Sequence, residues 1–503
     1  MDENTIIFSV LSPAKSIKTT NASLSAAYEK GWADIRSAAF TGDDTMQFSE
    51  PKSINVQQAI DDQKVGFLQW KILICCFLVV AADGLDTAGI GFIAPAIMTE
   101  WELSKPALTP LFISGLLGLT VGALLFGPLA DRLGRKNILI FSISLFGLMS
   151  LLSAFSPSLT VLIVARFLTG IGLGGALPTA ITLTSEFLPV RRRSALVTMM
   201  FCGFTLGSAL GGVLTAQLLP FIQWRGILIV GGILPLVLVL FLLFLMEESP
   251  RYRLLKQHSA EQMLRLMRKL TGVNYADQTS FFLAENKTEK NSIVALFQKN
   301  LLAITLVLWC AFFMSLLVIY MVSSWLPTLL AGIGIELESA SWITAAFQIG
   351  GTLGALLLGA LMDKQNPYKV LIVSYAMGAA FIASIGAAST SIPVLVLVIF
   401  GAGVGLSGAQ VGFNALVATL YPTGCRATGV SWANAMGRCG AIFGALVGGA
   451  MISWDLGFST IFMVLGIPAL ITALCLLILL QIARIKRHDM QLHISAVTAQ
   501  EAV

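Results

Sequence analysis

Two carboxylic acids stand in the middle of a long apolar stretch of the chain. Asp83 and Asp86 lie three residues apart within residues 70–97, where most side chains are apolar. In an α-helix this spacing puts both carboxylates on one face. A charged side chain at the centre of a bilayer costs about 2.5–3.5 kcal/mol, so we expect both acids to face a cavity or a partner. Because neighbouring anions repel each other where the dielectric constant is low, the pair is suited to binding and releasing a proton.

Two arginines stand in equally apolar surroundings. Arg166 opens the sequence Arg-Phe-Leu-Thr-Gly-Ile-Gly-Leu-Gly-Gly. We expect its permanent charge to pair with Asp83 or Asp86 and to change partner when a proton arrives, with a purely structural ion pair as the alternative. Arg438 lies near the middle of another apolar run that has no acid in its core. A guanidinium at that depth predicts a carboxylate ligand held by two hydrogen bonds, to which Asn434, one turn earlier, would add a third.

Composition indicates what kind of element positions these side chains. The chain has 503 residues, of which 56% are hydrophobic and only 12% are charged, which excludes a soluble enzyme. Crossing about 30 Å of hydrocarbon takes roughly 20 mostly apolar residues in a helix. Twelve such runs are present, so the predicted fold is an all-α membrane protein with twelve transmembrane helices. The runs cover residues 70–97, 109–129, 137–156, 159–183, 195–217, 226–246, 300–325, 341–361, 370–388, 392–415, 427–452 and 458–480.

Basic residues in the short loops predict the orientation of these helices. Arg132, Arg135 and Lys136 follow the second run, and three arginines at 191–193 follow the fourth. Short loops rich in arginine and lysine stay on the cytoplasmic side. Both termini are then cytoplasmic, and we expect the protein in the inner membrane of the cell. The seven cysteines lack metal-type spacing and predict neither a disulfide framework nor a metal site.

The expected organisation has five parts. They are a polar cytoplasmic tail, a six-helix half, a central cytoplasmic loop, a second six-helix half and a C-terminal cytoplasmic tail, at residues 1–66, 67–246, 247–299, 300–483 and 484–503. We expect the first tail to be disordered because it has few apolar residues, and Met46 is a second candidate start. Apolar residues spaced through 254–267 predict either an amphipathic helix on the membrane surface or, as we prefer, a linker with structural helices.

The two halves repeat each other. The sequence Gly127-Pro-Leu-Ala-Asp131 recurs 232 residues later as Gly359-Ala-Leu-Met-Asp363. A glycine pattern at Gly207 recurs 233 residues later at Gly440. Two parallel repeats that meet around a site near the middle of the membrane are typical of secondary transporters. Neither a receptor nor a membrane-bound enzyme needs such a repeat.

The first copy of the repeated loop belongs to a longer motif. The sequence Gly127-Pro-Leu-Ala-Asp131-Arg132-Leu-Gly134-Arg135-Lys136 resembles the cytoplasmic loop signature of the major facilitator superfamily. Here a carboxylate at a helix end pairs with arginine or with backbone groups, and a glycine permits a tight turn. We therefore expect a conformational latch made of Gly127, Asp131, Arg132, Gly134, Arg135 and, in the second copy, Asp363.

The acidic stretch resembles a narrower family. Asp83-Gly84-Leu85-Asp86-Thr87, followed by Gly91-Phe-Ile-Ala-Pro95, is similar to the first-helix signature of the aromatic acid:proton symporters, and the similarity extends from about Trp70 to Leu480. It implies a monomer in membrane lipid that imports benzoate, hydroxybenzoate or a related small aromatic carboxylate with protons, without cofactor, metal or nucleic acid. It also implies proton coupling by Asp83, Asp86, Glu186 and Arg166, and substrate binding by Arg438, Asn434 and Arg426.

Other functions stay open at this point. A ring-cleavage acid such as muconate would suit the same arginines. Glu248-Ser-Pro-Arg251-Tyr resembles a segment of sugar porters, but the run at 300–325 has no Gln or Asn for a sugar after its first residue, Asn300. A transporter-like sensor would need a sizeable signalling domain, and a membrane enzyme would need a set of catalytic groups. Neither is found, so a transporter is the favoured class.

Overall fold

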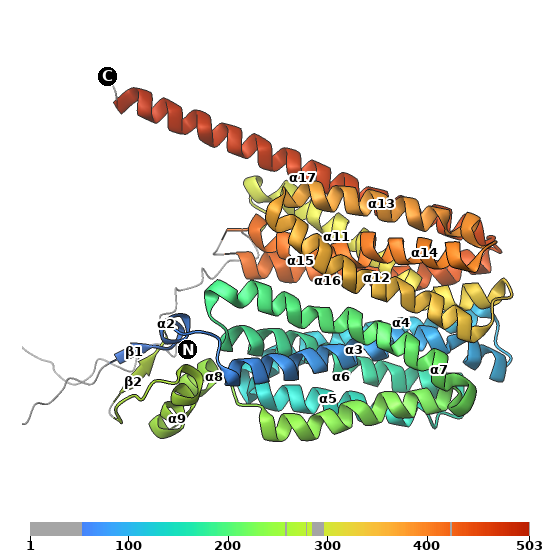
Figure 1. Cartoon of the computed structure of the whole chain (residues 1–503), viewed down its shortest axis with the longest axis horizontal. Helices are drawn as coiled ribbons and strands as arrows, with labels where there is room; N and C mark the ends of the chain where they lie inside the picture. Colours follow the sequence, from blue (N-terminus) through green and yellow to red (C-terminus); the bar gives the residue numbers. More distant parts are fainter. Residues whose placement is uncertain (1–52, 257–258, 278, 284–295, 423–424, 502–503) are drawn as a thin grey trace, which may run out of the picture. The chain divides into compact units, whose positions relative to one another are not determined.

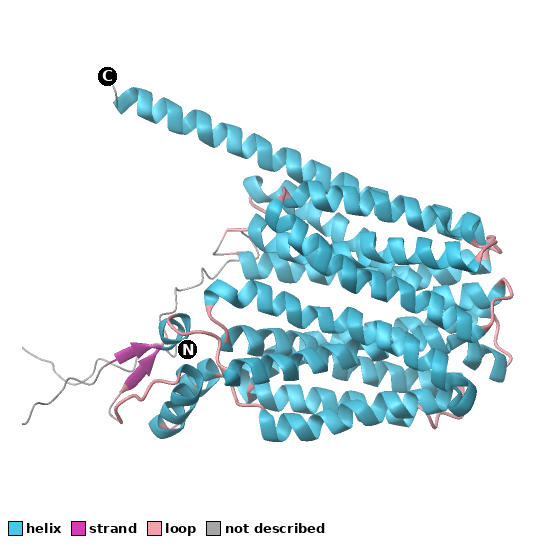
Figure 2. Ribbon diagram, in the orientation of Figure 1, coloured by secondary structure: helices cyan, strands magenta, loops and turns pink. Residues whose placement is uncertain are grey.

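The structure, a computed structural model, describes residues 53–256, 259–277, 279–283, 296–422 and 425–501; Met46 and the rest of residues 1–52 lie outside it. Helices dominate, with one pair of short parallel strands (Figures 1 and 2). In chain order the elements are β1 (Ser53–Asn55), α2 (Val56–Asp61), α3 (Phe67–Glu100), the 3₁₀-helix η1 (Lys105–Leu108), α4 (Thr109–Leu133), α5 (Arg135–Ser153), α6 (Leu159–Phe187), α7 (Val190–Leu245), α8 (Pro250–Leu255), α9 (Ala260–Thr271), β2 (Ser280–Phe282), α11 (Lys299–Gly332), α12 (Leu337–Lys364), α13 (Pro367–Ala388), α14 (Ile392–Gly403), the π-helix η2 (Val404–Gly408), α15 (Ala409–Leu420), α16 (Arg426–Ser453) and α17 (Phe458–Glu501).

The number of membrane spans follows from helix length. Within the described residues, eleven helices are long and apolar enough to cross a membrane, and α7 is the longest of them at 56 residues. A continuous helix of that length would extend about 84 Å, more than twice the hydrocarbon thickness. The backbone of α7 breaks at Gln223, where φ is 57°, so α7 consists of two spanning helices. The prediction of a multi-pass protein with twelve transmembrane helices is confirmed.

The spanning helices form two bundles of equivalent construction (Figure 1). In the first bundle α3 packs against α7 and α4 packs against α6; in the second, α11 packs against α16 and α12 packs against α14 and η2. Gly207 of α7 touches the backbone of Ala81, and Gly440 of α16 touches the backbone of Phe313, with no room at either glycine for a side-chain carbon. These two crossings are related by the same 232–233 residue offset, so the sequence repeat is also a structural repeat.

The two bundles touch closely at one end. Gly91 of α3 lies against the backbone of Ser323 on α11, and Gly449 of α16 lies against Thr109, the first residue of α4. Gly134 follows the opposite end of α4. The bundles are therefore closed on the side away from the loop at Gly134.

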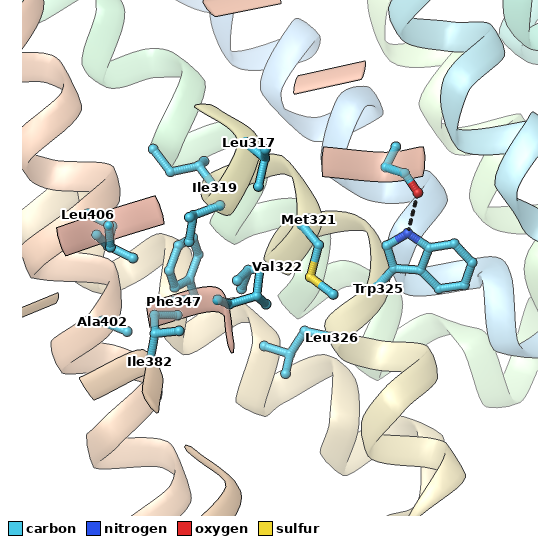
Figure 3. Packing of buried hydrophobic residues seen from close by; sticks show 14 of the residues in the cluster. Leu317, Ile319, Met321, Val322, Trp325, Leu326, Phe347, Ile382, Ala402 and Leu406 are labelled. Atoms are coloured by element: carbon cyan, nitrogen blue, oxygen red, sulfur yellow. Dashed lines mark hydrogen bonds between the residues drawn. The ribbon is translucent and has the colours of Figure 1, made fainter. Parts of the chain in front are cut away.

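Buried apolar residues of α11, α12, α13, α14 and η2 interlock in the second bundle, as Figure 3 shows. Trp325 of α11 is fully buried, and its indole Nε1 donates a hydrogen bond of 3.0 Å to the carbonyl oxygen of Ala445 on α16. Its ring also contacts Phe112 of α4 edge-on, with the ring centroids 4.8 Å apart. Trp325 thus links three spanning helices of both bundles.

The expectation of disorder fails for residues 53–61. β1 pairs with β2 of the central loop, and α2 buries Val56 and Ile60. Both side chains belong to an apolar cluster that includes Met267 and Leu270 of α9. These apolar contacts offset the entropy lost on ordering the segment. The apolar face of α9 is covered by protein, as expected for a linker with structural helices.

Candidate functional site

A cavity of about 150 Å³ lies between the two bundles. Helices α3, α4, α6 and α7 border it from one bundle, and α11, η2, α15 and α16 border it from the other. Its apolar wall is made of Leu116, Leu119, Leu177, Phe201, Phe204, Leu316, Ile319, Val411 and Ala441, and its polar groups come from Asp83, Thr205, Tyr320, Ser407, Gln410, Asn414, Asn434 and Arg438. A mostly apolar cavity with a few polar side chains is typical of a binding site for a small organic molecule.

Arg438 supplies the positive charge of this cavity. It is half-buried on α16 and interacts electrostatically with Asp83 of α3 and with Tyr320 of α11. Among the described residues Arg438 forms no direct ion pair, so its guanidinium retains hydrogen-bond donors for a ligand. The apolar run around Arg438 has no acid in its core. The acid that faces Arg438 comes instead from the other bundle.

Asp83 and Asp86 occupy different environments. Asp83 is 1% exposed, and its Oδ1 accepts a 3.1 Å hydrogen bond from the hydroxyl of Thr87. Asp86 forms a buried two-point ion pair with Arg166, in which Nη1 donates to Oδ1 at 2.9 Å and Nη2 donates to Oδ2. Ser150 donates a further hydrogen bond of 3.2 Å to Asp86. Asp86 therefore has a full complement of partners, whereas Asp83 makes no ion pair with an arginine of the described chain segments.

The Asp86–Arg166 pair borders a second, smaller cavity. Its volume is about 30 Å³, which is enough for a water molecule. Leu116, Leu119 and Tyr320 border both this cavity and the larger one. The two aspartates thus open onto adjoining cavities, and Tyr320 lies between them.

Glu186 does not join the aspartates. It lies on α6 twenty residues after Arg166, which corresponds to about 30 Å along the helix axis. Instead it pairs with Arg135 at 3.2 Å and accepts a hydrogen bond from Ser249. Arg135 also pairs with Asp131 at 2.8 Å. We refer to Asp131, Arg135, Glu186 and Ser249 as the charge cluster.

The rest of the loop motif surrounds the charge cluster. Gly134 has a φ of 101°, a backbone conformation that favours glycine, and the carboxylate of Glu248 accepts hydrogen bonds from the backbone of Arg135 and Lys136. Arg132 is exposed, and Gly127 has open space around it. The second copy differs, since Asp363 is exposed and forms no ion pair within the described part of the chain.

The three residues predicted to bind substrate do not all lie at the cavity. Arg438 and Asn434 both line the large cavity, and Asn434 donates a 2.9 Å hydrogen bond to the carbonyl oxygen of Val430. Arg426 is exposed at the first turn of α16 and donates to the carbonyl oxygen of Tyr421. Twelve residues, or about 18 Å of helix, separate Arg426 from Arg438. The structure therefore excludes Arg426 from the cavity.

Sequence reasoning missed the contribution of α15. Gln410 and Asn414 both line the cavity, yet neither was among the residues predicted to bind substrate. Gln348 of α12 does form such a bond, donating to Ser323 at 3.1 Å. In the sequence, α15 is distinguished only by two amide side chains in an apolar run. Gln348 is also an amide in an apolar run, so this feature alone does not identify residues that line the cavity.

Two six-helix bundles with a mostly apolar cavity between them, into which a few polar and charged side chains project, define a secondary membrane transporter. The comparisons agree. The model of the Major Facilitator Superfamily matches residues 76–336 and 308–493. A gallate transporter of Pseudomonas putida is 46% identical over 84% of this chain and 94% of its own length, and a 4-hydroxybenzoate transporter of Pseudomonas aeruginosa is 42% identical over 84% and 95%. The chain belongs to the Major Facilitator Superfamily, in the group whose named members are aromatic acid transporters and not enzymes.

A solved structure supports the fold. The D-xylose-proton symporter superimposes with a TM-score of 0.63 over 81% of this chain and 97% of that one, at 18% identity. At this identity the similarity concerns the fold alone. The resemblances to the superfamily and to its aromatic acid branch are both confirmed.

Proposed function

We propose that the protein imports a small aromatic carboxylate together with protons by alternating access. The observation that carries the proposal is the position of Arg438, which borders a mostly apolar cavity between the bundles and makes no direct ion pair among the described residues. A guanidinium binds a carboxylate through two parallel hydrogen bonds. The named substrates of the two relatives, gallate and 4-hydroxybenzoate, are aromatic carboxylates.

The size and lining of the cavity suit one aromatic ring. In another protein an apolar cavity of about 150 Å³ holds benzene, and the cavity here has the same volume. Phe201, Phe204 and Leu316 provide apolar surface on either side of the space. A ring stacked between these side chains would keep its carboxylate within reach of Arg438.

Asp83 is the proposed proton carrier. Its negative charge and the substrate carboxylate compete for the same guanidinium, because Asp83 interacts electrostatically with Arg438. A proton on Asp83 removes that competition, so protonation favours substrate binding. Asp86 and Arg166 neutralise each other, and we assign them to holding α3 against α6 next to the proton site.

The proposed transport cycle also requires an orientation in the membrane and a change between two conformations. The loop at Gly134 is rich in arginine and lysine, which supports a cytoplasmic position for this loop and for both termini of a protein in the inner membrane. The bundles touch at the opposite end, so the structure corresponds to an inward-facing state. The charge cluster then adjusts the balance between inward-facing and outward-facing states. One chain contains the whole cavity, and we propose that it acts as a monomer.

Uptake by whole cells tests this function. Cells that express the protein would receive labelled benzoate, 4-hydroxybenzoate, 3,4,5-trihydroxybenzoate, muconate and xylose, with and without a protonophore. We expect accumulation of one or more aromatic acids and its loss when the proton gradient collapses. Accumulation that survives the protonophore would overturn proton coupling, and uptake of muconate or xylose alone would overturn the substrate class.

A further inference from the structure

We propose that α15 binds a ring hydroxyl group, so that the site selects hydroxylated aromatic acids over benzoate. The inference rests on the proposed function, in which Arg438 holds the substrate carboxylate. It concerns Gln410 and Asn414, which lie one helical turn apart and both border the cavity.

Asn414 presents an unused hydrogen-bond acceptor. Its Oδ1 is buried and accepts no hydrogen bond from any described residue. A buried polar atom without a partner costs about 1–3 kcal/mol, so most such atoms in folded proteins are satisfied. Gln348, another amide in an apolar span, has its partner in Ser323. Asn414 differs because it borders the cavity while its Oδ1 has no partner among the described residues.

Gln410 is held in place from behind. Its Oε1 accepts hydrogen bonds of 2.6 Å from the hydroxyl of Ser315 and 3.0 Å from the hydroxyl of Tyr375, and these two hydroxyls are 2.8 Å apart. All three side chains are buried. The carbonyl end of Gln410 is thereby occupied, which leaves its amide group as the available donor of a side chain that borders the cavity.

A π-helix, η2, lies directly before α15 in the chain. η2 adds a wider turn at Val404–Gly408 within a span that is otherwise α-helical, and such a turn changes which residues of the following helix face a given side. α15 packs against α16, which carries Arg438 (Figure 1). A carboxylate group and a hydrogen-bonding group of one ligand can therefore be bound by neighbouring helices.

A phenolic hydroxyl is the chemistry that matches both amides. It donates one hydrogen bond, to the carbonyl of Asn414, and accepts another, from the amide of Gln410. A carboxylate accepts only and would repel the carbonyl of Asn414. An unsubstituted ring leaves both amides without a ligand partner, and a site built around a hydroxyl discriminates against the analogue that lacks it.

Binding to purified protein tests the inference. The dissociation constants of benzoate and 4-hydroxybenzoate would be measured for the wild type and for Asn414→Leu, which has nearly the same volume and no polar atom. We expect the wild type to bind 4-hydroxybenzoate about tenfold tighter than benzoate. We expect Asn414→Leu to bring the ratio close to one while benzoate affinity changes by less than about threefold.

The controls separate the two proposals. Gln348→Leu removes a buried amide outside the cavity and should keep the wild-type ratio. Asn414→Ser, a smaller change, replaces Asn414→Leu if that variant does not fold, and it should reduce the ratio in the same direction. A wild-type protein that binds neither acid contradicts the proposed function. If the wild type binds both acids and the ratio of their dissociation constants is unchanged in the Asn414 variants, only the role of α15 is contradicted. A wild-type preference for benzoate would also contradict only the role of α15.

Discussion

Asp83 and Arg438 stand in opposite bundles and border the same cavity, where they interact electrostatically without forming a direct ion pair. A proton or a substrate anion at this place changes the attraction between the bundles.

Replacement of Asp83 should uncouple transport from the proton gradient. Asp83→Asn keeps the volume and the hydrogen bond with Thr87 but carries no exchangeable charge. Because Arg438 then has no competing anion, we expect substrate exchange across the membrane to continue while accumulation against a gradient is lost. Exchange and accumulation of labelled 4-hydroxybenzoate in proteoliposomes measure the two processes. Wild-type accumulation by Asp83→Asn would remove Asp83 from the coupling mechanism.

Replacement of Asp86 should act mainly on stability. Asp86→Asn leaves the buried charge of Arg166 without its counter-charge, and breaking a buried pair in this way costs about 3–5 kcal/mol. The thermal unfolding midpoint of purified protein should therefore fall clearly more for Asp86→Asn than for Asp83→Asn. Equal midpoints for the two variants would show that the Asp86–Arg166 pair does not hold α3 to α6.

The closed end of the molecule depends on a glycine. Gly91 touches the backbone of Ser323, so the added carbon of Gly91→Ala forces α3 and α11 apart. Gly89→Ala is a matched control on the same helix, because Gly89 has open space around it. We expect Gly91→Ala to lower uptake and to expose a cysteine introduced by Ser324→Cys to an impermeant maleimide added outside the cell. Identical labelling of both glycine variants would argue against closure at this contact.

The charge cluster should affect the rate of transport more than the affinity. Asp131→Asn removes one of the two acids that pair with Arg135 and leaves the cavity untouched. We expect turnover to fall about tenfold with little change in substrate Kd, since only the balance of states shifts. Asp363→Asn is the control from the second repeat, where the acid is exposed, and it should stay within about twofold of wild type. A weaker substrate Kd with normal turnover in Asp131→Asn would contradict the assignment.

The sequence predicts those structural features of this protein that depend on nearby residues. Twelve spans, the tight turn at Gly134 and a partner for Arg166 follow from apolar length, spacing and the cost of an unpaired charge in a membrane. The position of Glu186 was also within reach, because twenty residues of helix place it about 30 Å from Arg166. The family resemblance alone grouped Glu186 with Arg166 for proton coupling. The length of helix between the two residues separates them.

Features that arise from packing between helices were not predictable in the same way. The approach of Asp83 to Arg438 depends on how the two bundles meet, and neither residue lies near the other in the sequence. The π-turn of η2, directly before the helix that carries Asn414, has no strong sequence signal. Short segments such as β1 and α2 take their order from contacts with β2 and α9, more than 200 residues away.

The binding of an acid compared with its amide tests the central claim most directly. Isothermal titration of purified protein would compare benzoate with benzamide, and wild type with Arg438→Lys, which keeps the charge but loses the planar two-point geometry. We predict that the wild type binds benzoate clearly and benzamide far more weakly, and that Arg438→Lys weakens benzoate binding by about 1–3 kcal/mol. Equal affinity of the wild type for the acid and the amide would contradict a carboxylate site at Arg438.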